Sequence, residues 1–296
     1  MTDQTIDRVA VVGAGRMGAG IAEVCALARV DVLVWEPTGE QAADARARII
    51  DSLGRAASSG TITEREREQA VARLRTTDDL ADLADRPLII EAVTEDRQLK
   101  TGLFRALDGL VTDPDAVLAS TTSSIPIAAL AAATDDPGRV LGMHFFHPVP
   151  LVPLVELVST PDTAAPAAMR AEAFARQVMG KEVVRSADEP GFIANALLVP
   201  FLLSAVRMVE SGRATAEEVD TTIALGPAHR MGPLRLADLL GLDTVAAIAD
   251  RMHAETGEAL YAPPPLLRKM VASGCTGRRA GRGFYRYTDT GALVRG

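Results

Sequence analysis

Residues 7–23 read DRVAVVGAGRMGAGIAE, an apolar run followed by a glycine-rich turn and then by helix-forming residues. Gly13, Gly15 and Gly18 have the spacing G-x-G-x-x-G, and the turn joins a predicted strand to a predicted helix. The first glycine permits the tight turn, the second lets the backbone approach a pyrophosphate, and the third lets the helix pack on its strand. The segment therefore predicts a Rossmann-type fold with a dinucleotide bound at the turn. The residues predicted to bind it are Gly13, Ala14, Gly15, Arg16, Met17 and Gly18.

The end of the next apolar run indicates which dinucleotide binds. Glu36 follows residues 32–35 and lies 18 residues after Gly18, where a carboxylate accepts hydrogen bonds from the adenosine ribose hydroxyls. The same carboxylate would repel a 2′-phosphate, and residues 37–39 offer no arginine to bind one. These features favour NAD over NADP. The alternative is a glycine turn that binds no nucleotide.

Strand-like and helical patterns alternate through the first half of the chain. Five short apolar runs are separated by longer helical patterns; they are residues 9–12, 32–35, 88–90, 116–119 and 140–143. This alternation predicts a doubly wound α/β sheet of parallel strands with helices on both faces. Two helical stretches between about residues 40 and 75 predict an arm that projects from the sheet. The arm either covers a ligand or packs as a helical hairpin on the sheet edge.

The pattern changes after residues 188–191. From there to about residue 275 the apolar residues have helical periodicity, with breaks at glycines and prolines and no convincing strand. We therefore expect residues 1–187 to form the NAD-binding domain and residues 188–296 to form an all-helical C-terminal domain. Residues 277–287 are expected to form a glycine turn and a short final strand or extended segment.

The composition excludes several classes of protein. Of the 296 residues, 48% are hydrophobic and 24% are charged, which is typical of a folded globular chain and not of a disordered one. The formal charge is −8 and only 4% of the residues are aromatic, so no nucleic-acid partner is expected. Cys25 and Cys275 lack metal-type spacing, so neither a disulfide framework nor a metal site is expected.

Two further features concern the location of the protein. The N-terminal residues do not read as a signal peptide. The longest apolar run, residues 193–209, is interrupted by polar residues and by Pro200, so it predicts a buried helix and not a membrane span. The sequence therefore predicts a cytoplasmic protein without a membrane partner.

Three polar residues near the ends of predicted strands are candidates for catalysis. His144 follows residues 140–143, so it should lie at the carboxyl end of the sheet, where ligands bind in open α/β folds. Glu156 lies in an apolar run 12 residues later and would orient the imidazole of a general base if the two side chains meet. Ser123 follows residues 116–119, and its hydroxyl would hydrogen-bond a substrate oxygen.

Each candidate also has a structural interpretation. His144 would then be a hydrogen-bonded core histidine and Glu156 a surface carboxylate. Ser123 or Ser124 would cap the following helix. Asn195, a polar residue in an apolar helical run, would bond a backbone carbonyl. Spacing alone does not join these residues into one site.

Six segments together carry a resemblance to a known family. They are the glycine turn with residues 19–22, then EAVTE (91–95), STTSS (120–124), GMHFFHP (142–148), PGFIAN (190–195) and MGPL (231–234). Over residues 7–287 the chain resembles the L-3-hydroxyacyl-CoA dehydrogenase family, in its branch for short acyl chains. The resemblance implies reversible, NAD-dependent oxidation of a short-chain (3S)-3-hydroxyacyl-CoA, of the 3-hydroxybutyryl-CoA type, to the 3-ketoacyl-CoA. It also implies that the helical domain binds substrate and forms a homodimer.

The resemblance assigns roles to individual residues. His144 would match the catalytic base of the family and Glu156 its partner acid. Ser123 and Asn195 would match the residues that hold the 3-oxygen of the substrate. Further positions that match cofactor contacts are Glu95, Lys100, Ser123, His147 and Arg279, with Lys100 also near the thioester.

The sequence departs from the family pattern at four positions. Thr121 and His147 stand where asparagine is usual, Arg230 stands where proline is frequent, and Arg279 replaces a lysine. His147 matters most, because an imidazole there would either titrate beside the catalytic histidine or merely replace an amide donor.

Other interpretations stay open. The same hydride chemistry would suit a hydroxyacyl group on a carrier protein or a free hydroxy acid, and a non-catalytic nucleotide sensor would be expected to lack one of the four catalytic residues. On the arm, one or two arginines would bind phosphates of CoA, and the others would form a solvated face with neighbouring glutamates. These arginines are Arg46, Arg48, Arg55, Arg65, Arg67, Arg73 and Arg75.

Overall fold

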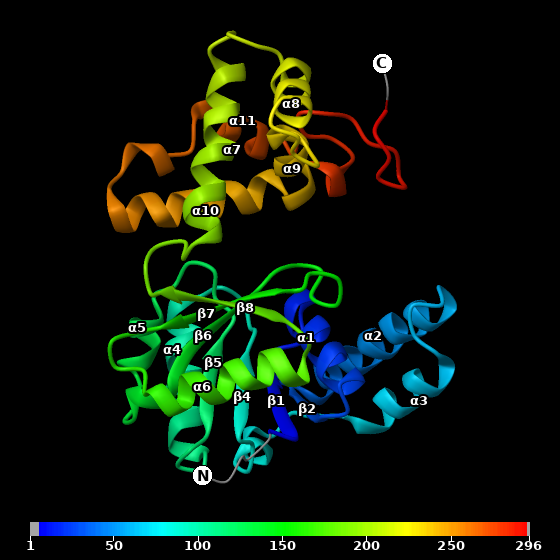
Figure 1. Cartoon of the computed structure of the whole chain (residues 1–296), viewed down its shortest axis with the longest axis vertical. Coiled ribbons are helices and arrows are strands. Elements are labelled where there is room, and N and C mark those ends of the chain that lie inside the picture. The colour runs from blue at the N-terminus through cyan, green and yellow to red at the C-terminus, as the bar shows by residue number, and fades with distance from the viewer. Residues whose placement is uncertain (1–5, 295–296) are drawn as a thin grey trace. The chain divides into compact units, whose positions relative to one another are not determined.

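The computed structural model describes residues 6–294 (Figure 1). The chain divides between Glu189 and Pro190 into two compact units. The predicted boundary between residues 187 and 188 lies two residues before this division. The first unit contains an eight-stranded sheet with flanking helices, and the second is built from helices. The predicted fold class, a Rossmann-type α/β domain followed by a helical one, is confirmed.

The sheet of the first unit places the ends of several strands at one edge. Its strands are β1 (Arg8–Val12), β2 (Asp31–Trp35), β3 (Leu74–Thr77), β4 (Leu88–Glu91), β5 (Val117–Ser120), β6 (Val140–Phe145), β7 (Leu154–Ser159) and β8 (Glu182–Ala187). Their order is β3-β2-β1-β4-β5-β6-β7-β8, and neighbours are parallel except β6 and β7. The order runs outward in opposite directions from β1 and from β4. The topological switch point, where open α/β folds bind ligands, therefore lies between these two strands.

Five of the eight strands match the predicted runs, and the sequence patterns do not predict the other three. Residues 74 and 75, at the end of the predicted arm, belong to the edge strand β3. In the other two strands, charged residues interrupt the apolar pattern that would predict a strand. β7 contains Glu156, and β8 contains Glu182 and Arg185. The expectation of a wholly parallel sheet is wrong at β6 and β7. Residues 146–153 are too few for a crossover helix, so β7 returns antiparallel to β6.

The helices of the first unit are α1 (Arg16–Leu27), α2 (Gly39–Ser58), α3 (Glu64–Arg73), α4 (Arg97–Leu110), α5 (Ile127–Ala131) and α6 (Ala165–Ala173). The predicted arm consists of α2 and α3 (Figure 1). Thr38 caps α2, and Thr63 forms a reciprocal capping box with Glu66 at the start of α3. Both helices contact α1, and α2 also contacts β3. The arm therefore packs on the edge of the sheet.

The second unit has its own core. Its helices are α7 (Ala194–Glu210), α8 (Ala216–Leu225), α9 (Pro233–Leu240), α10 (Leu242–Thr256) and α11 (Pro265–Ala272). Leu203, Leu234 and Ala249 from three of these helices are fully buried together. The described part of the tail forms turns and isolated bridges, such as Gly277 with Arg282, so it is an extended segment and not a strand. The buried carboxylate of Asp238 holds this tail by accepting hydrogen bonds from backbone N–H groups at residues 284 and 285.

Three general properties concern residues 6–294. None of their helices combines the length and the apolar character that crossing a bilayer requires. No group of three or more His, Cys, Asp or Glu side chains within this range is arranged to hold a metal ion. Cys25 and Cys275 are both free thiols, the first buried and the second half-buried.

Candidate active site

The glycine turn connects β1 to α1. Gly13 has a φ of +88°, a left-handed conformation that favours glycine, and a Cβ there would lie 2.8 Å from Cγ1 of Val93. A Cβ on Gly18 would collide with the carbonyl oxygen of Gly13, so α1 packs directly against the turn. A Cβ on Gly15 would meet nothing within 4 Å. The turn is therefore tight on its inner side and open beside Gly15.

The start of α1 fits the phosphates of a dinucleotide. Gly15 is its N-cap, and among the described residues no side chain caps the first turn. The positive end of the helix therefore points its backbone N–H groups towards the open space. The end of β2 adds Glu36, whose Oε1 accepts a hydrogen bond from the N–H of Ala14 at 2.6 Å. This bond holds a carboxylate beside the turn, where the residues present fit the adenosine ribose and the pyrophosphate of NAD.

His144 and Glu156 form a buried pair. The antiparallel register of β6 and β7 places the two residues directly opposite each other. Nδ1 of His144 lies 2.7 Å from Oε2 of Glu156, and the two residues are 5% and 2% exposed. A carboxylate only accepts hydrogen bonds, so Nδ1 carries the proton and Nε2 is the basic nitrogen of the neutral ring. The ring of Phe146 lies 4.7 Å from the imidazole, centroid to centroid, and restricts its orientation.

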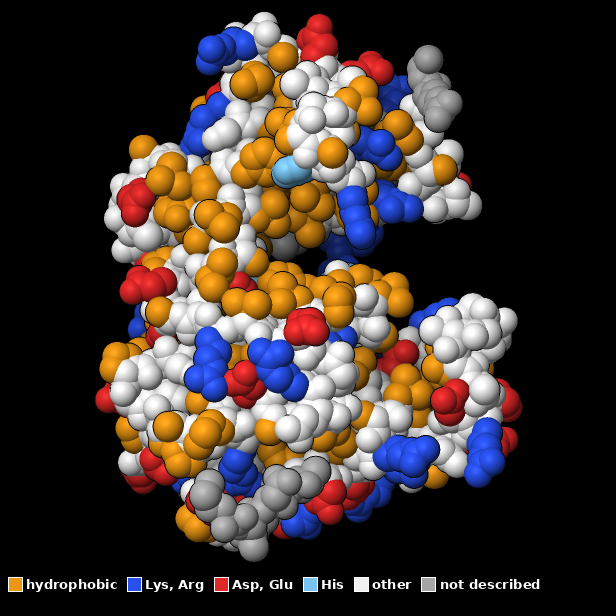
Figure 2. All heavy atoms as spheres, viewed as in Figure 1, with side chains coloured by type: hydrophobic (Ala, Val, Ile, Leu, Met, Phe, Trp, Pro, Cys, Tyr) orange, Lys and Arg blue, Asp and Glu red, His pale blue; other side chains and the backbone are white. Residues whose placement is uncertain are grey.

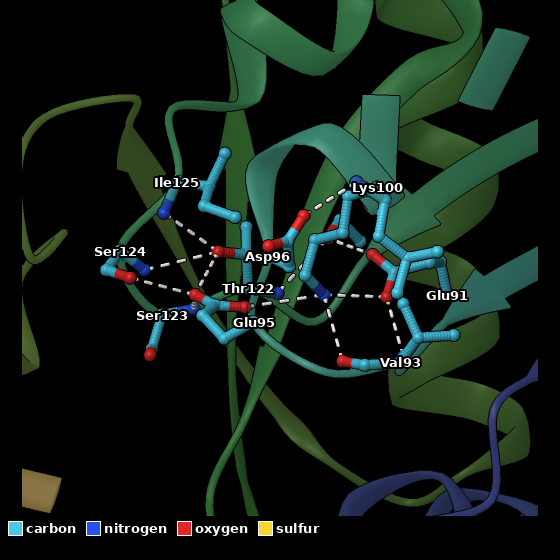
Figure 3. A network of polar contacts seen from close by, with 11 residues as sticks. Glu91, Val93, Glu95, Asp96, Lys100, Thr122, Ser123, Ser124 and Ile125 are labelled. Atoms are coloured by element: carbon cyan, nitrogen blue, oxygen red, sulfur yellow. Dashed lines mark hydrogen bonds and ion pairs between the residues drawn. The ribbon is translucent and has the colours of Figure 1, made fainter. Parts of the chain in front are cut away.

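Ser123 lies in a turn that Glu95 organises. Oε1 of Glu95 accepts hydrogen bonds from the hydroxyl of Thr122 at 2.5 Å, the N–H of Ser123 at 3.1 Å and the hydroxyl of Ser124 at 2.8 Å. Figure 3 shows the side chain of Ser123 pointing away from this carboxylate. Burial alone would raise the pKa of Glu95, but the Lys100 ammonium and these three donors lower it below its usual value. Glu95 is therefore ionised at neutral pH and fixes the backbone that presents Ser123.

Lys100 lies deeper than the predicted cofactor contact requires. Its side chain is 1% exposed, and its ammonium donates to Oε1 of Glu91 at 2.6 Å and to the carbonyl oxygen of Val93 at 3.3 Å. The same ammonium lies 3.4 Å from Oε2 of Glu95. Direct contact between Lys100 and a ligand is therefore not what this geometry supports.

His147 lines a cleft of about 1240 Å³ beside the glycine turn. The same cleft is lined by Gly15 and Arg16 and, from the arm, by Arg48 and Arg55. Burial lowers the pKa of His147, and the Arg16 guanidinium lowers it further, so the imidazole is neutral at pH 7. The cleft is therefore lined by three arginines and Lys181, by the acidic residues Glu23 and Asp51, and by a neutral histidine.

Asn195 and Arg279 belong to the second unit. Asn195 is the second residue of α7, where it is 9% exposed and its N–H donates to the carbonyl oxygen of Gly191 at 3.0 Å. Arg279 lies 3.5 Å from Asp243 in an ion pair. The predicted roles of both residues stay predictions.

The structure also decides between earlier alternatives. Glu156 is not a surface carboxylate, because it is buried against His144. The interpretation of Ser123 or Ser124 as a helix cap is wrong, because the first N–H groups of α5 donate to the carboxylate of Asp188 at 2.8 and 2.7 Å. Sequence reasoning did not select Glu91, whose only signal is that a charged residue ends a buried apolar strand.

Comparisons with known proteins agree with this arrangement. Residues 8–189 match the family model described as 3-hydroxyacyl-CoA dehydrogenase, NAD binding domain, and residues 191–287 match the C-terminal domain of that family. The chain is 59% identical over 282 residues to 3-hydroxybutyryl-CoA dehydrogenase of Mycobacterium tuberculosis, which covers 95% of this chain and 99% of that protein. It is 37% identical over 289 residues to the human mitochondrial hydroxyacyl-coenzyme A dehydrogenase, covering 95% of this chain and 91% of that one. The crystal structure of (S)-3-hydroxybutyryl-CoA dehydrogenase from Ralstonia eutropha is similar with a TM-score of 0.90 and 38% identity, covering 96% of this chain and 100% of that one.

Proposed function

The chain belongs to the 3-hydroxyacyl-CoA dehydrogenase family, and from this membership we propose that it oxidises a short-chain (3S)-3-hydroxyacyl-CoA to the 3-ketoacyl-CoA with NAD. The substrate is of the 3-hydroxybutyryl-CoA type, and the reaction is reversible. The proposal rests on one observation, the buried pair of His144 on β6 and Glu156 on β7. This pair lies in the same unit as a glycine turn that fits a dinucleotide.

The residues of the site divide the chemistry between them. When bound, NAD supplies the acceptor for the hydride that leaves C3 of the substrate. His144 removes the proton of the 3-hydroxyl at Nε2, so that the C3–O bond becomes a carbonyl. Glu156 keeps the Nδ1 proton in place and stabilises the imidazolium that forms. Ser123 donates a hydrogen bond to the 3-oxygen and shares its negative charge, and the family match assigns the same role to Asn195.

Charged side chains select the cofactor and the group that carries the acyl chain of the substrate. Glu36 accepts from the ribose hydroxyls of NAD and repels the 2′-phosphate of NADP. Arg48 and Arg55 line the cleft beside the glycine turn, and we propose that they pair with phosphates of CoA. An acyl-carrier protein or a free hydroxy acid would use these two arginines differently or not at all.

Steady-state kinetics with a panel of substrates test the proposal. We expect the highest kcat/KM for 3-hydroxybutyryl-CoA with NAD, and a value about 100-fold or more lower with NADP, because Glu36 repels the added phosphate at short range. The same acyl group on a carrier protein and free 3-hydroxybutyrate are the matched comparisons. A higher kcat/KM for either would overturn the choice of CoA, and nucleotide binding without any NADH formation would indicate a sensor.

We also propose that the protein is a homodimer, as its family membership implies. Figure 2 shows apolar side chains gathered on the visible face of the second unit. Leu197 of α7 and Leu225 of α8 are 71% and 79% exposed, among the highest values for large apolar side chains in residues 6–294. Light scattering after size exclusion should give the mass of two chains, and Leu197→Glu with Leu225→Glu should shift it to one. A single-chain mass for the unmodified protein would contradict the proposal. The cytoplasmic location stays a prediction from the sequence.

A further inference from the structure

Three charged side chains, from the end of β4, the loop after it and α4, form a row (Figure 3). We define the buried charge row as Glu91, Lys100 and Glu95. Nζ of Lys100 lies 2.6 Å from Oε1 of Glu91 and 3.4 Å from Oε2 of Glu95, so one ammonium stands between two carboxylates. The side chains of Glu91 and Lys100 are each 1% exposed, and that of Glu95 is 24% exposed. Two members of the row are therefore shielded from water and the third reaches the surface.

The two carboxylates of the row accept hydrogen bonds from several donors. Besides the ammonium, Glu91 accepts from the N–H of Val93 at 2.7 Å and from the hydroxyl of Ser120 at 2.7 Å. Glu95 accepts from two hydroxyls and one N–H of residues 122–124. Although burial raises the pKa of Glu95, the Lys100 ammonium and these donors lower it below its usual value. Glu91 forms an ion pair with the same ammonium at 2.6 Å. Two carboxylates and one ammonium give the row a net charge of −1.

The row lies at the switch point of the sheet. Val93, two residues after β4, is within contact distance of the place a Cβ on Gly13 would occupy, so the loop after β4 adjoins the glycine turn. Glu36 marks the adenosine side of the dinucleotide at the end of β2. The nicotinamide half of a bound dinucleotide would lie on the side of β4 and β5, where Glu95 is the exposed member of the row.

We propose that the buried charge row makes the protein discriminate between the two redox states of its cofactor, favouring the oxidised form. The inference rests on the proposed function, because it requires a nicotinamide dinucleotide. The oxidised ring carries one positive charge and the reduced ring is neutral, whereas the remainder of the two molecules is the same. A net negative charge behind the ring therefore stabilises only the oxidised complex, and protein around the row screens it poorly. Glu91 and Lys100 act as positioning residues, through the charge and placement of Glu95.

Glu91→Gln tests the charge with little change of shape. The amide oxygen can accept from Lys100 and from the N–H of Val93, and the amide nitrogen can donate to the hydroxyl of Ser120. The net charge of the row becomes zero. We expect the ratio of the Kd for NAD⁺ to the Kd for NADH to rise about five- to thirty-fold, the order expected when one unit charge near the ring is removed from a partly screened site. The Kd for NADH alone should change by less than a factor of about two, because the neutral ring has little interaction with the row.

Two further variants separate charge from structural damage. Glu91→Gln with Lys100→Met removes both members of the ion pair and restores the net charge of −1, so the ratio should return towards that of the unmodified protein. Glu68→Gln, at an exposed position on α3, makes the whole protein less negative by the same one unit of charge and should leave the ratio unchanged. Glu95→Gln reaches a net charge of zero from the exposed end of the row and should raise the ratio even if Glu91→Gln does not fold.

Calorimetry for NAD⁺ and fluorescence titration for NADH give both constants without turnover. A loss of affinity for both forms by the same factor would assign Glu91 a purely structural role and overturn the inference. So would an unchanged ratio in Glu91→Gln or, if that variant does not fold, in Glu95→Gln. If the unmodified protein binds neither form, the proposed function itself fails, which is a different result.

Discussion

Replacing His144 with glutamine should lower kcat for 3-hydroxybutyryl-CoA oxidation by about 10³- to 10⁴-fold, the upper range for loss of a general base. The glutamine side chain reaches about as far as the imidazole but has no nitrogen that binds a proton at neutral pH. The 3-hydroxyl proton must then pass to water. At about 1.4 kcal/mol for each factor of ten, this is about 4–5 kcal/mol of barrier. Stopped-flow measurement of NADH formation under saturating substrate gives the chemical step directly.

The binding of cofactor provides the control for this variant. His144 lies on β6, whereas the glycine turn and Glu36 lie at the ends of β1 and β2. We therefore expect the Kd for NADH to change little in His144→Gln. The matched variant is His253→Gln in α10, where the imidazole bonds the carbonyl oxygen of Glu258 and should be irrelevant to turnover. Retention of more than about a tenth of kcat in His144→Gln would reject this residue as the base.

The features predicted from the sequence are those that one local segment contains. The glycine turn needs only its own residues, since Gly13 supplies a positive φ and Gly18 the close packing. The strands β1, β2, β4, β5 and β6 are short apolar runs bounded by turn residues, so each is recognisable alone. β3 cannot be recognised in this way, because it follows α3 directly and its residues 74–77 read LRTT, which is not an apolar run. Its place in the sheet comes from pairing with β2, which no local pattern contains.

The contact between His144 and Glu156 shows the same limit. The sequence selects both residues, but their meeting depends on the antiparallel register of β6 and β7. A shift of one residue would turn Glu156 to the opposite face of the sheet. The environment of Glu91 is even harder to predict, because the groups that donate hydrogen bonds to it lie 2, 9 and 29 residues away in the sequence. They belong to the loop after β4, to α4 and to β5. Such a site is assembled by the fold, and it becomes visible only when the strand order is known.

Glu156→Gln should lower kcat by about 10²- to 10³-fold, because the imidazolium formed in the reaction loses its charged partner. The amide is nearly isosteric with the carboxylate, so a bond to Nδ1 of His144 can persist at the observed 2.7 Å. Its amide nitrogen can also turn towards the ring and hold the wrong tautomer, with the proton on Nε2. Either arrangement weakens the base without removing it. The effect should therefore be smaller than that of His144→Gln, with little change in the Kd for NADH.

The double variant decides whether the two residues act as a unit. If Glu156 works only through the imidazole, then His144→Gln with Glu156→Gln should be no slower than His144→Gln alone, within a factor of about three. Independent action would instead multiply the two losses, to about 10⁵-fold or more. Thermal unfolding of all three variants separates this coupling from a loss of fold, because a buried carboxylate that has lost its partner destabilises the core. A multiplicative loss in folded protein would show that Glu156 acts on the substrate or the cofactor directly, and the assignment of the pair as a base held by its acid would be wrong.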